Sequence, residues 1–377
     1  MKQYILYILV VCNFGMLRAS GQAATTIGSL RFLGAYNIPY NKRFNGTTIG
    51  GLSGIDYDAA KKVYYLISDD RSEMNPVRYY TAKIFINPHG IDSVEMVDVT
   101  TIRQPNGNPY PNAKQDPQHT PDPEALRYNA KENTMVWSSE GERIVQPGKM
   151  VLENPAVTLI HPDGQYIDTF ALPPNMYMQA AEQGPRQNGV FEGLAFANNY
   201  QTLYVSVEEP IYEDGPPAGT GDSTAWVRIL QYNTATKNPV AQYAYQIDPV
   251  AEAPLPAGGF KINGISDILW VGNHQLLVME RSASAGRLKF VIRLYLADLK
   301  VATDVSHITS LQQNRSFVPI KKKLLLNMNT LHRYVDNVEG MTFGPTLPNG
   351  HKTLVFVSDN NFLFFQKTQF LLFEVLP

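Results

Sequence analysis

Apolar and polar residues along the chain repeat as a two-part pattern that occurs five times. The first part opens with a small or acidic residue and ends in an aromatic one, and the second part is an apolar run that ends in an acid. The second residues of the first parts stand at positions 54, 125, 193, 267 and 340, so successive copies are 71, 68, 74 and 73 residues apart. Such a period indicates repeated units that bury one another's apolar faces. The first parts are Ser53–Tyr57, Glu124–Tyr128, Glu192–Phe196, Ser266–Trp270 and Glu339–Phe343, and the second parts are Tyr64–Asp69, Met135–Glu140, Leu203–Glu208, Leu276–Glu280 and Leu354–Asp359.

Each copy of the pattern predicts a β-hairpin, because its apolar residues are mostly β-branched or aromatic and a short polar turn separates the two parts. A second strand pair lies between copies, for example Thr81–Ile86 with Ser93–Val97 and Trp226–Tyr232 with Val240–Ile247. Two hairpins per period make a four-stranded unit, and such units arranged in a ring are the blades of an all-β propeller. We therefore predict a single propeller of five four-stranded blades, or six if one blade lacks the pattern.

The ends of the chain are expected to close this ring. The runs Ile27–Tyr36 and Phe370–Leu376 are both strand-like, and we expect them to pair within one blade. A helical repeat protein is excluded because no segment shows a sustained apolar period of 3.6 residues with caps.

The first 23 residues are predicted to be a signal peptide. Lys2 gives a positive start, Tyr4–Leu17 is an apolar stretch too short for a comfortable membrane span, and Ser20–Ala23 ends on a small residue that suits signal peptidase. The alternative is a buried N-terminal strand. We expect an exported protein, secreted or periplasmic, whose propeller domain occupies residues 24–377.

Composition limits the chemistry and the partners. The only cysteine is Cys12, so residues 24–377 have no thiol or disulfide. A lipoprotein anchor at Cys12 is disfavoured because Val11 stands where a small residue is expected. Removal of Lys2 and Arg18 leaves 32 − 2 = 30 basic residues against 34 acids, a net charge of −4. This mild acidity argues against a nucleic-acid partner and against any strong electrostatic attachment to a membrane. No further segment is apolar enough to be a transmembrane segment.

The hairpins predict where the acids of the pattern lie. The start of one strand and the end of its antiparallel partner are at the same end of a hairpin, so ring symmetry brings these acids to one face. Long segments rich in Pro and Gly (102–123, 173–190, 209–224 and 249–263) attach at that face, and loops of this length are usually functional. The acids expected at this loop-rich face are Asp69, Asp70, Glu124, Glu140, Glu142, Glu192, Glu208, Glu209, Asp267, Glu280, Glu339 and Asp359.

Many carboxylates at one ring opening repel one another unless cations intervene, and oxygen ligands without His or Cys favour Ca²⁺. Arg71, Arg143 and Arg281 follow the acids directly, and guanidinium groups bind phosphate in bidentate fashion. The combination predicts a site for a small phosphorylated substrate. The alternative is structural: the acids accept backbone N–H bonds from neighbouring blades, and the arginines pair with the acids.

Several segments resemble the phytase-like, "esterase-like activity of phytase" family. They are Asp122–Leu126, Ser138–Arg143, Gly184–Phe196, Asn337–Met341 and Leu354–Phe362. The resemblance extends from about Leu30 to the end and implies a secreted propeller that hydrolyses phosphoesters or phosphodiesters. It also implies that Glu124, Glu140, Glu192, Glu339 and Asp359 match the recurrent acids of the family, whereas Ser53 and Ser266 depart from it.

The sequence therefore predicts an exported phosphoester or phosphodiester hydrolase assisted by Ca²⁺. The opposing hypothesis is a non-catalytic propeller that binds a ligand or a protein partner on the loop-rich face, and it predicts no turnover of any phosphoester. The predicted catalytic residues are Glu124, Glu192 and Glu339, the substrate-binding residues are Arg71, Arg143 and Arg281, and the metal ligands are Asp69, Glu140, Glu208 and Asp359.

Overall fold

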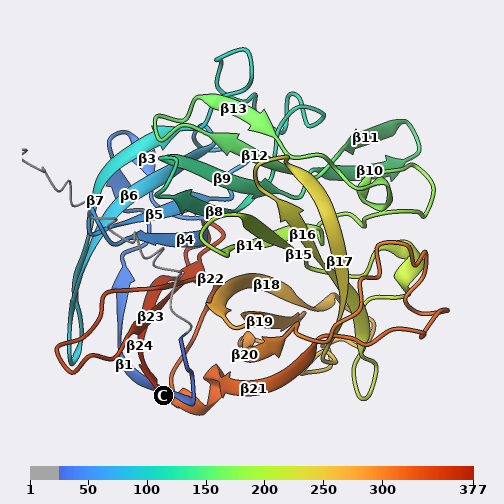
Figure 1. Ribbon diagram of the computed structural model, residues 1–377. Coiled ribbons are helices and arrows are strands. Elements are labelled where there is room, and N and C mark those ends of the chain that lie inside the picture. The colour runs from blue at the N-terminus through green and yellow to red at the C-terminus, as the bar shows by residue number, and fades with distance from the viewer. Residues whose placement is uncertain (1–24) are drawn as a thin grey trace, which may run out of the picture.

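The computed structural model describes residues 25–377, and in them five four-stranded antiparallel sheets surround one axis as the blades of a propeller (Figure 1). The prediction of an all-β propeller with five blades is confirmed. The predicted signal peptide, residues 1–23, lies outside the described residues. From the inner to the outer strand, blade 1 is β4 (Leu52–Asp58), β5 (Val63–Ser68), β6 (Arg78–Asn87) and β7 (Gly90–Thr101); blade 2 is β8 (Pro123–Asn129), β9 (Thr134–Ser139), β12 (Ala156–Ile160) and β13 (Tyr166–Thr169); blade 3 is β14 (Phe191–Ala197), β15 (Thr202–Val207), β16 (Ala225–Asn233) and β17 (Asn238–Ile247); blade 4 is β18 (Lys261–Gly272), β19 (Gln275–Ser284), β20 (Val291–Asp298) and β21 (Lys321–Asn327); and blade 5 is β22 (Asn337–Phe343), β23 (Thr353–Asp359), β24 (Thr368–Leu376) and β1 (Ser29–Ile38).

Two small hairpins and three 3₁₀-helices complete the described part of the chain. The hairpins are β2 (Arg43–Phe44) with β3 (Thr47–Thr48), and β10 (Glu142–Gln146) with β11 (Lys149–Glu153). No α-helix occurs between residues 25 and 377, and no helix there is long and apolar enough to cross a membrane. The 3₁₀-helices are η1 (Pro174–Met176), η2 (Tyr212–Asp214) and η3 (Met328–Leu331).

The two ends of the chain close the ring, as predicted. Strand β1 pairs with β24 from Ser29 opposite Leu376 to Ile38 opposite Thr368, so the N-terminal strand is the outer strand of the last blade. The inner strands β4, β8, β14, β18 and β22 contact one another in that order, and β22 contacts β4. The ring is therefore continuous around the axis.

The core lies between the blades. Strands β5 and β9 are buried along their whole length because each blade is covered by a neighbour on both sides, which explains their unbroken apolar runs. Residues of neighbouring blades mix in single apolar clusters; Ile67 and Tyr79 of blade 1 pack with Trp137 of blade 2. The packing between blades therefore holds the five units in one ring.

A buried ion pair, the central latch of Arg127 and Asp267, joins all five inner strands. Arg127 lies in β8, and its Nε donates to the Leu194 carbonyl of β14 at 2.6 Å while Nη1 donates to the Ile55 carbonyl of β4. Its Nη2 lies 2.8 Å from both oxygens of Asp267 in β18. Asp267 Oδ2 accepts the backbone N–H of Met341 in β22 at 2.8 Å. Burial raises the pKa of Asp267 to about 6 even though the Arg127 charge opposes this rise.

We expect Arg127→Met to lower the free energy of unfolding by about 3–5 kcal/mol, because the substitution leaves Asp267 buried without its cation. Denaturation by urea, followed by tryptophan fluorescence, measures the change. The control is Lys114→Met, which removes the exposed ion pair with Glu73 and should change stability by less than about 1 kcal/mol. Equal small losses in the two variants would contradict a role for the latch in ring stability.

Candidate functional site

Each inner strand carries a β-bulge at the position where the first part of the sequence pattern begins. In β4 the pairing with β5 shifts between Leu52 and Gly54, so Ser53 is the extra residue. In β22 the shift lies between Val338 and Gly340, and Glu339 is the extra residue. Similar shifts occur in β8, β14 and β18. A bulge re-aims side chains and ends regular pairing. The pattern thus encodes a bulge at one end of every blade.

The glycine that follows these bulge residues has a packing reason. A Cβ on Gly193 would lie 2.5 Å from the Ile268 nitrogen of the next blade, and one on Gly340 would lie 2.9 Å from the Ser53 carbonyl. These distances are too short for any side chain, so glycine permits the inner strands to approach one another closely.

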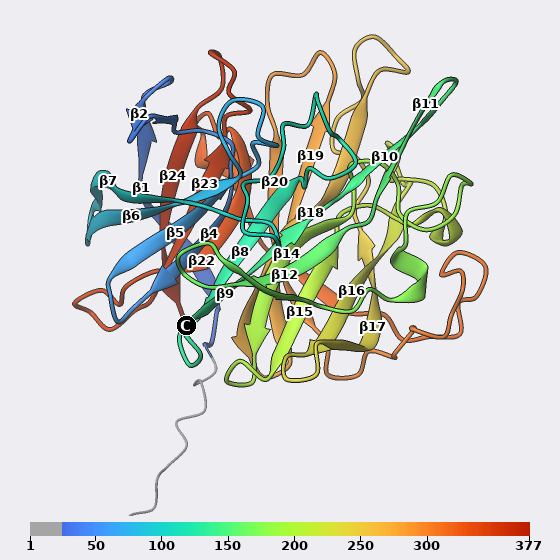
Figure 2. The same cartoon turned by 90° about the horizontal axis from the view of Figure 1, so that it is seen from above.

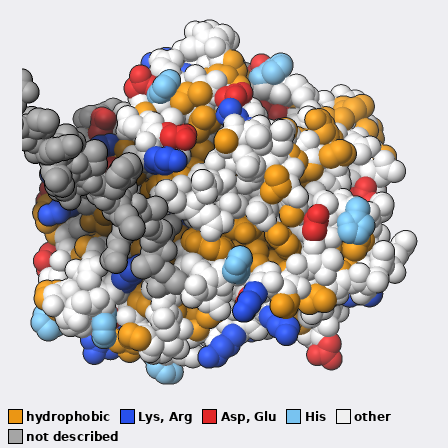
Figure 3. All heavy atoms as spheres, in the orientation of Figure 1, with side chains coloured by type: hydrophobic (Ala, Val, Ile, Leu, Met, Phe, Trp, Pro, Cys, Tyr) orange, Lys and Arg blue, Asp and Glu red, His pale blue; other side chains and the backbone are white. Residues whose placement is uncertain are grey.

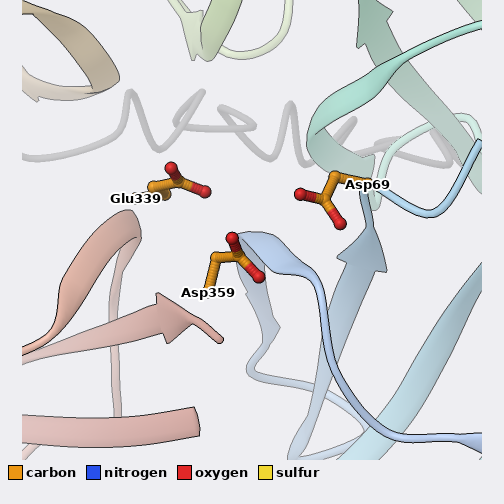
Figure 4. A group of neighbouring side chains, drawn as sticks. All are labelled: Asp69, Glu339 and Asp359. Atoms are coloured by element: carbon orange, nitrogen blue, oxygen red, sulfur yellow. The ribbon is translucent and has the colours of Figure 1, made fainter. Parts of the chain in front are cut away.

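We define the ring mouth as the bulge residues, the acids at the ends of the second strands of blades 1, 2, 3 and 5, Arg281 of blade 4, and Asp122. Three groups of carboxylates there place one oxygen of each member within 4.8 Å of the others. Figure 4 shows the first group, in which Asp69, Glu339 and Asp359 point toward one space. Seven of the twelve acids that the sequence predicts for this face belong to these groups. The three groups are Asp69, Glu339 and Asp359; Asp122, Glu124 and Glu140; and Glu140, Glu192 and Glu208.

The ring mouth lies on the loop-rich face. Its residues continue into the loops that project from one side of the disc, at the top of Figure 2, whereas the C-terminus lies on the opposite side. Figure 3 shows that opposite face, where the acidic side chains in view lie away from the centre. The loop 102–123 packs beside the mouth, since the Thr120 carbonyl accepts a bond from Arg71 at 3.3 Å.

Three carboxylates of the ring mouth, those of Asp69, Glu124 and Glu192, accept no hydrogen bond from any residue between 25 and 377. Glu192 is only 5 % exposed. The remaining acids have few donors: Glu140 accepts the Val190 N–H at 2.6 Å, a bond between neighbouring blades of the kind that the structural alternative predicts. The mouth therefore holds buried and half-buried carboxylates, three of which have no hydrogen-bond donor in the described part of the chain.

Two buried acids outside the ring mouth, Asp70 and Asp214, are fully partnered. Asp70 accepts three backbone N–H bonds and pairs with Arg78 at 2.8 Å. Asp214 receives two bonds from Arg228 and one from the Leu311 N–H. Unpartnered buried acids carry a desolvation cost that partnered ones do not. The acids of the ring mouth thus differ from Asp70 and Asp214 of the same fold.

Burial, followed by mutual repulsion, raises the pKa values of these carboxyl groups. The pKa of Glu208 rises from its ordinary 4.5 to about 8, and that of Asp359 from 3.8 to about 8. Burial also raises the pKa values of Glu124 and Glu192 well above the ordinary range, with each repelled by further acids of the mouth. The charged state of this cluster is unstable in the fold unless positive charge is supplied.

The three predicted arginines are placed differently. Arg281 lies in the ring mouth, where it donates to Glu208 at 2.9 Å and lies 3.6 Å from Glu339. Arg71 lies at its edge, 2.7 Å from Glu142 and 3.6 Å from Asp122. Arg143 instead lies in β10, where it donates to the backbone carbonyls of residues 179–181. The contacts thus give no support to a substrate-binding role for Arg143.

The fourth blade corrects the sequence prediction. Glu280 does not reach the ring mouth: it accepts bonds from Tyr245, Asn263 and Lys322 between blades 3 and 4. It pairs with Ile265, so in register it matches the residue before the acid of the other repeats, and Arg281 takes the acid's place. The apolar run before Glu280 is one residue shorter than the others, which was the available signal.

Asp267 was also expected at the loop-rich face and belongs to the central latch, because it is the residue after the bulge. Conversely, Asp122 is a member of the ring mouth that the acid pattern missed. The only signal for it was its place two residues before Glu124 in the Asp-Pro-Glu segment. Each of the three carboxylate groups contains at least one predicted metal ligand and a predicted catalytic residue, and one group also contains Asp122. The assignment of metal-binding and catalytic roles to individual acids therefore stays a prediction.

Solved structures with a similar arrangement have low sequence identity to this chain. A thermostable family-43 glycoside hydrolase is 9 % identical with a TM-score of 0.47, covering 90 % of this chain and 96 % of its own. A family-43 β-1,3-galactosidase with galactodeoxynojirimycin is 11 % identical with a TM-score of 0.45, covering 89 % and 93 %. An N-acetylgalactosamine deacetylase from F. plautii is 10 % identical with a TM-score of 0.44, covering 92 % and 95 %. No argument about function follows from likenesses at this level.

A comparison with curated proteins found no match. The sequence profile described as "Phytase-like: Esterase-like activity of phytase" matches residues 47–362, which include the inner strands of all five blades and the whole ring mouth. The match covers well over half of the chain and confirms the resemblance that the motifs indicate. The chain therefore belongs to the phytase-like family.

Proposed function

We propose that this protein is an exported phosphoester hydrolase, assisted by Ca²⁺, whose active site is the ring mouth. The observation that carries the proposal is the convergence of carboxylates of which three have no hydrogen-bond donor among residues 25–377, in a fold whose buried acids Asp70 and Asp214 are fully partnered. Membership of a family named for esterase-like activity supports hydrolysis. Export rests on the pattern of residues 1–23 alone.

The donor set of the ring mouth fits Ca²⁺. The three groups consist of carboxylates, with no His or Cys among them, and Ca²⁺ takes six to eight oxygen ligands from carboxylates, carbonyls and water. Asp69, Glu339 and Asp359 would hold one ion, and Glu140, Glu192 and Glu208 a second. When bound, Ca²⁺ would neutralise phosphate charge and lower the pKa of a bound water.

The residues of the chain would divide the remaining work by charge and position. Arg281 stands among the acids and would orient a phosphate oxygen, because its guanidinium presents several donors in a fixed plane. Arg71 would add a second positive charge at the edge. Glu124, half-buried and without a hydrogen-bond donor among residues 25–377, would accept the proton of the attacking water as general base. The substrate would be a small phosphomonoester or phosphodiester.

The second candidate function is a non-catalytic propeller that binds a ligand or a protein on the same face. The bond from the Val190 N–H to Glu140 favours it, because that acid already links two blades. A panel of phosphate monoesters, diesters and phytate, assayed with Ca²⁺ and with a chelator, separates the two candidates. Turnover that requires Ca²⁺ supports the hydrolase, and no turnover in either condition supports the binding protein.

We expect the melting temperature in a chelator to fall as the pH rises from about 4.5 to about 8, the interval over which Glu208 loses its proton first in the unfolded and then in the folded protein. Carboxyl groups with raised pKa values stabilise the fold while protonated, and this contribution is lost as they ionise. Ca²⁺ should reduce the fall, so its stabilising effect should grow with pH. A thermal-shift series at several pH values measures both effects, and equal slopes with and without Ca²⁺ would contradict cation binding.

We expect Glu192→Gln and Glu339→Gln to weaken the rise in melting temperature caused by Ca²⁺ and to lower phosphoester turnover at least about tenfold, because glutamine keeps the shape but removes the charge. The matched control is Glu280→Gln, which changes a buried acid outside the ring mouth. It should lower stability equally with and without Ca²⁺. Indifference of the unsubstituted protein to Ca²⁺, with equal losses in all three variants, would support the structural alternative.

A further inference from the structure

The loop-rich face carries apolar side chains at the tips of loops that the ring mouth does not use. In the loop between β23 and β24, Phe364 is 77 % exposed and stands beside exposed Leu363 and Phe365. In the loop between β19 and β20, Leu288 is 89 % exposed. Exposed apolar side chains of this size, gathered on one face, indicate an interaction site.

The same loops begin next to residues of the ring mouth. The loop with Phe364 begins directly after Asp359, and the loop with Leu288 follows the part of β19 that contains Arg281. The exposed residues Leu255 and Phe260 are linked to the loop that holds Leu288. The Leu255 N–H donates to the Ala285 carbonyl, and the Ala285 N–H donates to the Phe260 carbonyl. Figure 2 shows that these loops project on the same side of the disc as the hairpin β10–β11. The apolar tips therefore surround the opening of the proposed active site.

Each apolar tip has a basic residue within three positions. Lys289 follows Leu288, Lys367 follows Phe365 by two residues, and Lys149 precedes exposed Met150 at the turn of β10–β11. None of these three lysines pairs with a carboxylate among residues 25–377. The rim thus carries apolar side chains and, beside them, lysines that are unpaired within the described chain, around an acidic interior.

We propose that the loop-rich face docks on an anionic phospholipid surface and that the substrates of the ring mouth are phosphoesters presented there. This inference rests on the proposed function. Aromatic and leucine side chains beside lysines suit the boundary between headgroups and acyl chains, and each lysine is attracted to anionic headgroups. A protein partner would instead require one contiguous apolar core, whereas these tips stand on separate blades.

The test is sedimentation with vesicles, using the chain from residue 24 onward, which contains the whole closed ring. Vesicles of phosphatidylcholine alone are compared with an equimolar mixture of phosphatidylcholine and phosphatidylglycerol, in a chelator so that no cation bridges protein and headgroup. We expect binding to the mixed vesicles, and a loss of about tenfold in Phe364→Ser/Phe365→Ser. Lys289→Glu/Lys367→Glu should remove the preference for the anionic vesicles.

The matched control is Val301→Ser, because Val301 is 57 % exposed and follows β20 at the end of blade 4 that lies away from the ring mouth. It should bind as the unsubstituted protein does. No vesicle binding, or an equal loss in the control, overturns the proposal. Light scattering is measured on the same samples without lipid: self-association that disappears in the Phe364→Ser/Phe365→Ser variant would assign the tips to a second copy of the chain and also overturn it.

Vesicle binding and phosphoester turnover together distinguish a failure of the docking proposal from a failure of the proposed function. Glu192→Gln should bind the mixed vesicles normally, because Glu192 is buried in the ring mouth and away from the tips. Turnover of soluble phosphoesters without vesicle binding would overturn only the docking. Vesicle binding without turnover of any phosphoester, soluble or lipid, would support the docking and overturn the hydrolase.

Discussion

The ion pair between Arg127 and Asp267 is the interaction on which the geometry of the ring depends. Replacement of both members of such a pair by apolar residues is often neutral for stability. The importance of this pair therefore lies in the directed hydrogen bonds that it makes to the inner strands, and not in its energy alone. A guanidinium has five N–H donors in one plane, and those of Arg127 reach carbonyls or carboxylates of three other inner strands. Asp267 in turn accepts a backbone N–H bond from β22, the fifth inner strand. No apolar pair can set the distances between five strands in this way.

The latch and the ring mouth use acids in opposite ways within a short distance along the same strands. Asp267 is the residue after the bulge in β18 and is saturated by donors. Glu192 and Glu339 are instead bulge residues, and Glu339 is one of the acids that repel the charged form of Glu192. The latch fixes the inner strands, so the mouth cannot widen to relieve the repulsion among its carboxylates. Proton uptake or cation binding is then the remaining way to lower the charge, and this constraint makes the site suited to a hard cation.

The sequence was sufficient to predict the fold and the convergence of the acids, because both depend on local patterns. Two hairpins per period define a blade, and a bulge at a fixed place in each copy aims Glu124, Glu192 and Glu339 to the same face. The latch was not predictable, since Arg127 and Asp267 are 140 residues apart and neither stands out in its own repeat. The position of Glu280 was predicted wrongly because the local pattern was misleading: an acid ended the apolar run, as in the other repeats. The run is one residue shorter, however, so the Glu280 side chain points to the other face of the sheet.

The fourth blade breaks the symmetry of the ring mouth, because it places positive charge on one side of an otherwise acidic site. Four blades place Asp69, Glu140, Glu208 and Asp359 after their second strands, but blade 4 places Arg281 there and Ser266 at the bulge. A ring of carboxylates alone would attract cations and repel phosphate from every side. Because one buried guanidinium stands among them, next to Glu208 and Glu339, an anion can approach from blade 4 while cations are held by the other four blades. Under the proposed function, the departure of this blade from the repeat would give the site separate places for a metal ion and for a phosphate.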